Sequence, residues 1–258
     1  MTSNNKHIRF IALVISLYGA FIDVNPARAE TMAFEPGEKL KYALRWENIP
    51  AGELHLEIRP ITTIGDFPAY HFVLIAKTNS AMDLFCKIRD RIDAYADTQM
   101  THSVYYQKKR AGGKKVKREQ TTFDWLNNKV QYTGSGAPHK PSRLLPGSFD
   151  PLSAFYYTRM AISEKKPHIL RPVTDGRSNF MGDTKIIGRE TITLNSGRRY
   201  DTLVLEPDIG LFAGVYKDSK DAKLRVWITA DEKRIPVQIK TKVKVGHFIG
   251  ELVSAEGV

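Results

Sequence analysis

The stretch Leu224–Leu252 constrains the fold more strongly than any other part of the chain. In its first half, Leu224, Val226 and Ile228 alternate with Arg225, Trp227 and Thr229, and the polar turn Ala230–Arg234 follows. In its second half the apolar positions are Ile235, Val237, Ile239, Val243 and Val245, and the lysines between them are Lys240, Lys242 and Lys244. A period of two places one set of side chains on a core and the other in water. The stretch therefore predicts a long antiparallel hairpin whose lysine row faces solvent.

Further strands are expected along the chain, most of them alternating and separated by turn residues; Ala69–Lys77 is more uniformly apolar, and the run Ser80–Ala96 could also form a helix. The expected strands are Lys39–Trp46, Glu53–Arg59, Ala69–Lys77, Lys87–Ala96, Val104–Lys109, Lys114–Phe123, His168–Val173, Lys185–Leu194 and Arg199–Glu206. One helix is expected at Pro151–Ile162, because Asp150 can cap it and Pro151 suits its first turn. We expect an all-β, mainly antiparallel fold. It would be a long curved sheet, or an open β-barrel or half-barrel, with this helix packed near the concave side.

The N-terminus has the three parts of a secretory signal peptide. Lys6 and Arg9 precede the apolar run Phe10–Ile22, and Ala27–Ala29 is a small-x-small cleavage site. This order predicts a signal peptide over residues 1–29. The apolar run is too short to span a bilayer comfortably. We therefore expect an exported, periplasmic chain whose mature part, residues 30–258, is a single β-rich domain without a transmembrane span.

The formal net charge of the chain is +11. An exported basic protein meets anionic lipid headgroups, lipopolysaccharide or acidic glycans more readily than nucleic acid. The alternative is that the charge serves only solubility. The composition therefore favours an anionic envelope partner and argues against a nucleic-acid partner.

Seven basic residues lie within one predicted hairpin around the glycines at positions 112 and 113. They are Lys108, Lys109, Arg110, Lys114, Lys115, Lys117 and Arg118. One interpretation is that they project together and contact an anionic surface such as phospholipid or lipopolysaccharide. The other is that they are a solvated hairpin whose charges prevent edge pairing. No stacking aromatic residues interleave with them, which again argues against nucleic acid.

A ligand site is expected on the concave side of the sheet. Its wall would be the apolar row of the long hairpin, together with the apolar loop Ile209–Tyr216 and the helix. The candidate ligand-binding residues are Val237, Ile239, Val243, Val245, Leu211, Phe212 and Phe155. The alternative is that the loop folds back into the core and that the helix fills the concave space.

Motifs for catalysis and cofactors are missing from the sequence. The histidines lack metal-ligand spacing, and Ser153 lacks the flanking glycines of a nucleophile elbow. No phosphate-binding or dinucleotide-binding fingerprint occurs. The single cysteine, Cys86, excludes an intramolecular disulfide, and its apolar neighbours predict a buried, inert thiol. We therefore predict no catalytic residue, no metal and no cofactor.

Four phrases together resemble an exported bacterial family called domain of unknown function 3108. They are FEPGEKLKYALRWENIPAGELHLEI, KIRDRIDAYAD, FDPLSAFYYTRM and VWITADEKRIPVQIKTKVKVGHFIGEL. The resemblance runs from about Phe34 to Leu252. It implies a Gram-negative periplasmic or envelope protein with a β-rich fold and without assigned catalytic residues. At the level of fold it is similar to the curved sheets of periplasmic lipoprotein carriers.

The sequence favours a non-enzymatic periplasmic protein that binds a lipophilic or anionic envelope component. Its partner would be a lipid, lipopolysaccharide or an envelope protein, with peripheral membrane contact. Two alternatives stay open. One is a scaffold or interaction protein in envelope assembly, and the other is a hydrolase of envelope esters.

Overall fold

The computed structural model describes residues 32–258 except for 113–114, 135–138, 209–222 and 244–245. The described residues form fourteen strands and two helices. The first strands are β1 (Lys39–Trp46), β2 (Ile49–Ile64), β3 (Phe67–Thr78), β4 (Arg89–Asp97), β5 (Ser103–Gly112), β6 (Lys115–Asp124), β7 (Lys129–Thr133) and β8 (Ser142–Arg143). The later strands are β9 (His168–Thr174), β10 (Asn179–Thr193), β11 (Arg199–Pro207), β12 (Lys223–Thr229), β13 (Pro236–Val243) and β14 (Gly246–Glu256).

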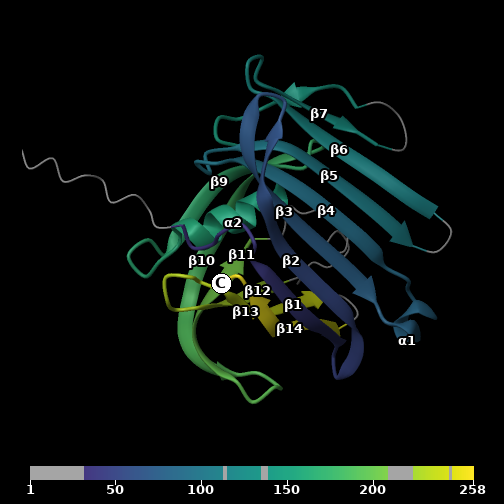
Figure 1. Ribbon diagram of the computed structural model, residues 1–258, viewed down its shortest axis with the longest axis vertical. Coiled ribbons are helices and arrows are strands. Elements are labelled where there is room, and N and C mark those ends of the chain that lie inside the picture. Colours follow the sequence, from purple (N-terminus) through teal and green to yellow (C-terminus); the bar gives the residue numbers. More distant parts are fainter. Residues whose placement is uncertain (1–31, 113–114, 135–138, 209–222, 244–245) are drawn as a thin grey trace, which may run out of the picture.

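All fourteen strands belong to one sheet in which each strand is antiparallel to its neighbours. The chain runs outward from β1 to β8, crosses to the other edge, and returns from β9 to β14, which pairs with β1. Figure 1 shows the strongly curved shape of this sheet. The prediction of an all-β, antiparallel, curved and open sheet is confirmed.

Local breaks in register accompany the curvature. They occur between Leu44 and Arg45, between Arg59 and Thr62, and between Ile186 and Gly188, among others. Such bulges bend a strand and increase its twist. The sheet therefore curls until its two edges approach each other.

Side chains and single backbone contacts bridge the gap between the two edges. Thr121 on β6 donates to the carbonyl of Asp175 at 2.7 Å, and the Asn179 amide donates to the carbonyl of Arg143 at 2.8 Å. Phe149 makes an isolated bridge with Val173 of β9. The edges thus meet through these contacts and leave the barrel without a continuous ladder at this seam.

The longer helix, α2 (Pro151–Ala161), lies against the concave face, where it contacts β3, β4 and β9. The Asp150 carboxylate accepts from the backbone N–H groups of Leu152 and Ser153, both at 2.9 Å, which satisfies two of the free donors at the helix start. The predicted helix is confirmed. The shorter helix, α1 (Ser80–Asp83), joins β3 to β4. Neither of these two helices is long and apolar enough to cross a membrane.

Aromatic rings from the helix and the sheet meet in the core. The rings of Tyr156 on α2 and Phe72 on β3 stack at 4.1 Å, and Phe34 packs edge-on against both. Tyr42 of β1 is also fully buried. We define the concave face as the face of the sheet that carries Phe72 and meets α2.

The convex face of β12 is covered, in contrast to the expectation from its alternation. Trp227 was expected beside the solvent-facing side chains, yet it is buried, and its indole N–H donates to the Glu190 carboxylate at 2.7 Å. Leu194 and Val204 are buried in the same region. Val204 on β11 lies directly opposite Trp227, so apolar side chains of the neighbouring strand cover this face, which alternation along one strand does not reveal.

Candidate ligand-binding site

A cavity of about 450 Å³ lies between α2 and the concave face. The helix contributes Pro151, Ala154, Phe155 and Thr158 to its lining. The sheet contributes Leu74, Ile92, Ile169, Arg171, Val173, Gly182, Asp183, Thr184, Leu205, Pro207, Asp208, Leu224 and Val226. Its volume falls within the range of about 300–1,000 Å³ that is usual for small-molecule sites.

The walls of the cavity are apolar because of cross-strand pairing. Leu74 on β3 lies directly opposite Ile92 on β4, and Leu205 on β11 lies opposite Val226 on β12. Opposite residues in an antiparallel pair point to the same face. Two pairs of adjacent apolar side chains therefore face each other across the space beneath α2.

Polar groups rim this cavity. The Arg171 guanidinium lies 4.3 Å from the centre of the Tyr157 ring and donates to its hydroxyl. The Asp183 carboxylate is hydrogen-bonded to His168 Nε2 at 2.6 Å. An apolar interior with a few fixed polar groups is the usual composition of a site for an amphiphilic ligand.

The predicted ligand residues are only partly brought together by the fold. Phe155 lines the cavity. Val237 is fully buried in the core, and Ile239 packs against the core directly opposite Val226. The predicted row on β13 therefore lies on the same face of the sheet as the cavity, but one strand away from it. The cavity wall is formed by Leu224 and Val226 of β12 instead. The difference arises because α2 lies over β3, β4 and β9, a position that strand alternation does not determine.

The remaining predicted contacts lie outside the described residues. They are Leu211 and Phe212 in the loop, and Val245 in the long hairpin. For Val243 the strand is described and the side chain is not. Pro207 at the end of β11 and Leu224 near the start of β12 both line the cavity.

The basic hairpin does not present its charges on one side, which corrects the expectation of a common projection. Lys108 lies opposite Ile92, whereas Lys109 lies opposite Arg118 on the other face. Period-two alternation sends Lys108 and Arg110 toward the concave side. Burial lowers the pKa of Lys108. Of the other predicted contacts, Lys117 is exposed, the Lys115 side chain is not described, and Lys114 is outside the described residues.

Lys108 and Arg110 belong to a charged strip that continues the apolar wall of the cavity. Asp90 lies opposite Arg110, and Glu119 lies opposite Lys108. Burial raises the pKa of Asp90, and the Nε of Arg110 is buried without a hydrogen-bond partner. The strip places polar chemistry beside Ile92, at one end of the apolar space. Alternation along β4 and β5 is the sequence signal for this strip, since it places Asp90, Lys108 and Arg110 on the same face of the sheet as Ile92.

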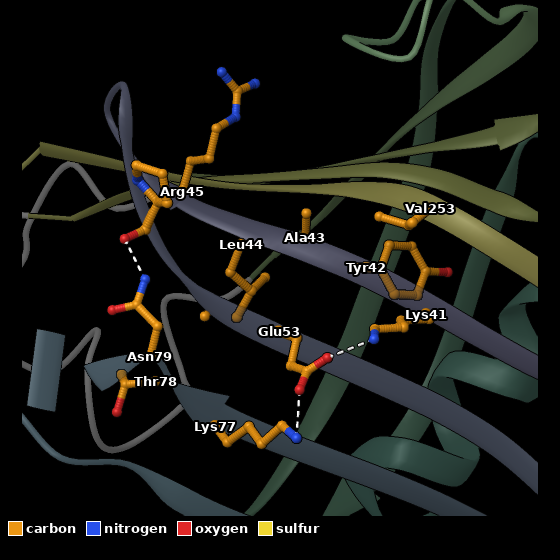
Figure 2. A pocket seen from close by; sticks show the side chains of 12 residues that line it. Lys41, Tyr42, Ala43, Leu44, Arg45, Glu53, Lys77, Thr78, Asn79 and Val253 are labelled. Carbon is orange, nitrogen blue, oxygen red and sulfur yellow. Dashed lines mark hydrogen bonds and ion pairs between the residues drawn. The ribbon is translucent and has the colours of Figure 1, made fainter. Parts of the chain in front are cut away.

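A second hollow, of about 390 Å³, lies between β1, the start of β2 and the end of β3 (Figure 2). Glu53 lies there between Lys41 and Lys77 and forms an ion pair with each; the Lys41 pair measures 2.9 Å. Hydrogen bonds from Lys77 and Lys41 lower the pKa of Glu53 to about 2. The Glu53 carboxylate is already engaged by both ammonium groups, and these three side chains carry one net positive charge between them. This hollow is therefore a weaker candidate for an ionic ligand than the concave cavity is for an apolar one.

A metal site and a reactive thiol are two further chemistries that the described residues could support. No cluster of three or more His, Cys, Asp or Glu side chains in that part is arranged to hold a metal ion. Cys86 is exposed, so the expectation of a buried thiol is wrong. The apolar residues Leu84 and Phe85 that precede it, on which that expectation rested, are 83% and 85% exposed.

Comparisons with known proteins agree with the fold and leave the activity open. A family model described as "Protein of unknown function (DUF3108)" matches residues 41–253. The chain is also similar to a β-barrel-like protein of the domain of unknown function DUF1849 from Brucella abortus, known from a crystal structure. The TM-score is 0.56 at 9% sequence identity, and the match covers 87% of this chain and 99% of that one. No curated protein sequence matches the chain.

Proposed function

The chain belongs to the family of proteins of unknown function DUF3108, and we propose that it binds a lipophilic envelope component in the cavity beneath α2. The observation that carries this proposal is the apolar space of about 450 Å³ between the helix and the concave face. The ligand would place an apolar chain between Phe155 and the Leu74–Ile92 pair. Its polar end would face either the rim around Arg171 or the charged strip beyond Ile92.

The energetics of the site support an apolar chain. Each methylene group that leaves water for such a space contributes about 0.8 kcal/mol. Eight buried methylene groups would therefore supply about 6 kcal/mol before the costs of association, which are of similar size. A medium or long acyl chain is the ligand class that can exceed those costs.

The location of the ligand follows from the predicted signal peptide. Residues 1–29 lie outside the described part of the chain, so export to the periplasm is part of the proposal. A periplasmic protein meets its lipophilic ligands at the two envelope membranes. We propose a non-enzymatic binding or carrier role there.

The proposal is tested with the purified mature protein, residues 30–258, and a fluorescent long-chain fatty acid. Ala154→Trp adds an indole to the helix face that lines the cavity and is expected to weaken binding at least about tenfold by occupying the space. Val253→Trp is the matched control, because Val253 lines the other hollow and is half exposed. Organic extraction followed by mass spectrometry would identify any lipid that copurifies with the protein.

Three outcomes distinguish the possibilities. Saturable binding that is lost in the Ala154 variant and retained in the Val253 variant supports the cavity as the site. Absence of probe binding together with absence of copurified lipid contradicts the proposed function. Equal binding by both variants contradicts the assignment to this cavity.

A further inference from the structure

We propose that the protein docks onto an anionic bilayer through the end of the sheet where α1 and the β5–β6 hairpin meet. In this arrangement Leu84 and Phe85 insert among the lipid headgroups, and basic residues on the outer face of the hairpin contact lipid phosphates. The docking surface is distinct from the cavity, and its operation does not depend on a ligand beneath α2.

Two large apolar side chains are exposed side by side at this end. Leu84 is 83% exposed, Phe85 is 85% exposed, and both directly follow α1. Ile88 is also exposed. Adjacent exposed apolar residues of this size mark contact sites with membranes or partners more often than single scattered ones.

The segment that carries these residues is anchored firmly to the sheet. The Asn79 side chain caps α1 by accepting from the Met82 N–H at 2.9 Å, and it donates to the Pro50 carbonyl at 2.7 Å. The Asp83 carboxylate binds the guanidinium of Arg89, on the next strand, at 2.6 Å. Leu84 and Phe85 are thus held outward by fixed neighbours, and their exposure is a feature of the folded chain.

Basic side chains flank the apolar pair. Ala111 pairs with Arg89 at the start of β4, which brings the end of β5 next to the segment after α1 (Figure 1). Lys109 on β5 lies directly opposite Arg118 on β6. Like charges placed opposite each other destabilise a sheet unless a counter-charge is near. An anion from outside the protein, such as a lipid phosphate, would therefore stabilise the pairing of Lys109 with Arg118.

The same face has a shallow hollow that suits a headgroup. It is lined by Lys109, Val116, Arg118, Gln120, Thr133 and Gly134. Val116 is 56% exposed. The nearby acid Glu119 points to the concave side, where it pairs with Arg177 at 3.3 Å. The outer face of this hairpin, as far as its side chains are described, is consequently basic and partly apolar.

Charge and apolar surface together select the bilayer as the partner. Basic residues near an anionic membrane attract it at short range, and exposed Leu and Phe side chains gain from entry into the interfacial region. An acidic protein would satisfy the charges without requiring the Leu84–Phe85 pair to enter an apolar layer. The bilayer uses both features at once.

The docking surface also lies near the cavity. Leu74 is four residues from the end of β3 at Thr78, and Ile92 is three residues from the start of β4 at Arg89. These separations correspond to about 13 Å and about 10 Å along the strands. A docked protein would therefore hold its cavity wall close to the membrane surface.

The test uses vesicles of phosphatidylcholine with and without phosphatidylglycerol in a flotation assay with the predicted mature protein, residues 30–258. Wild-type protein is expected to float only with the anionic vesicles. The pair Lys109→Glu and Arg118→Glu should lower the affinity at least about tenfold, since each basic residue near the surface contributes several-fold. The matched control pair, Lys129→Glu and Arg199→Glu, changes the net charge equally at exposed positions elsewhere on the sheet.

The apolar contribution is tested separately. Leu84→Ser with Phe85→Ser should weaken flotation, whereas Leu126→Ser, at an exposed leucine in the β6–β7 turn, should not. The exposed thiol of Cys86 provides a direct probe. A polarity-sensitive fluorophore attached there should shift to shorter emission wavelength when the wild-type protein binds anionic vesicles.

The proposal is overturned if the fluorophore at Cys86 shows no shift while the protein is bound, or if both serine substitutions leave flotation unchanged. It is also overturned if the two control reversals weaken flotation as much as the two hairpin reversals. The Ala154→Trp variant separates this proposal from the previous one. It should lose the fatty-acid probe and keep its affinity for vesicles.

Discussion

Arg159 and Glu38 form an ion pair that is fully enclosed by the protein. Arg159 Nη1 lies 2.5 Å from Glu38 Oε1, Nη2 lies 2.8 Å from Oε2, and both side chains are 1% exposed. The guanidinium also donates to the carbonyls of Ala33 and Lys233. One side chain of α2 is thereby joined to the segment before β1 and to the β12–β13 turn. This pair fixes the helix inside the curved sheet and so helps to define the cavity.

Removal of this pair should destabilise the protein strongly. Arg159→Met leaves Glu38 buried without its partner, and we expect the free energy of unfolding to fall by about 3–5 kcal/mol. Urea denaturation followed by tryptophan fluorescence measures the change. Arg189→Met is the control, because Arg189 pairs with Asp201 and Glu164 on the surface, where solvent screens the charges, and its loss should change the stability far less. Equal effects of the two substitutions would contradict this view of α2.

The buried carboxylate of Asp93 should make stability depend on acid. Burial raises its pKa, but hydrogen bonds from His71 at 2.8 Å and from Arg91 at 2.8 and 2.6 Å outweigh this effect and hold the pKa well below its usual range. A carboxylate whose folded pKa is lowered stabilises the protein above its unfolded pKa of about 3.9, and this contribution disappears as the pH falls toward the folded pKa.

Asp93→Asn tests this dependence. The substitution should cost about 2 kcal/mol at neutral pH, and the difference from wild type should shrink below about pH 4. Denaturation curves measured at several pH values give the difference directly. A gap between the two proteins that stays constant or widens in acid would show that the charge of Asp93 is not what stabilises this site.

Gly176 should be required where the β9–β10 turn crosses the inner face of β6. A Cβ atom at this position would lie 2.8 Å from Thr121 Oγ1 and 3.1 Å from the Tyr132 Cβ. Gly197 has a similar positive φ, +80° against +85°, and open space around it. Gly176→Ala should therefore cost more stability than Gly197→Ala, by about 1–3 kcal/mol. Thermal unfolding of both variants isolates the effect of the steric clash, because the backbone strain is similar at the two positions. Equal losses of stability would contradict close packing of Gly176 against Thr121 and Tyr132.

Cys86 should react with a thiol reagent in the native protein. Its exposed position predicts one equivalent of rapid modification by Ellman's reagent without denaturant. Addition of urea should change the rate little and the stoichiometry not at all. Slow modification that accelerates strongly in urea would indicate that the segment after α1 is covered in solution.

Much of the fold is predictable because period-two alternation is local. The strands and the capped helix at Asp150–Pro151 follow from patterns within a few residues. The cavity is different, because its walls come from Leu74 and Ile92 in one half of the chain and Val226 in the other. Their approach depends on the curvature of the sheet, which the bulges increase, and on the position of α2. The ion pair between Arg159 and Glu38, which are far apart in the sequence, helps to fix that position.

The segment around Cys86 shows where local patterns mislead. Leu84, Phe85 and Ile88 give it the composition of a core segment, yet all three are exposed. The basic hairpin shows the opposite error, since alternation along β5 turns Lys108 away from Lys109. In both cases the kind of side chain is plain from the sequence. Whether that side chain lies in the core, on the concave face or in solvent depends on how the strands and α1 are arranged in space.

The most direct test of the central claim is photo-crosslinking with a long-chain fatty acid that carries a diazirine on its chain. The labelled residues are located by peptide mass spectrometry. We predict labels on α2 around Phe155 and on the facing strands around Ile92 and Val226, with competition by unlabelled fatty acid. Labels confined to the convex face or to the Leu84–Phe85 segment, or labelling that unlabelled fatty acid does not reduce, would contradict a ligand site beneath α2.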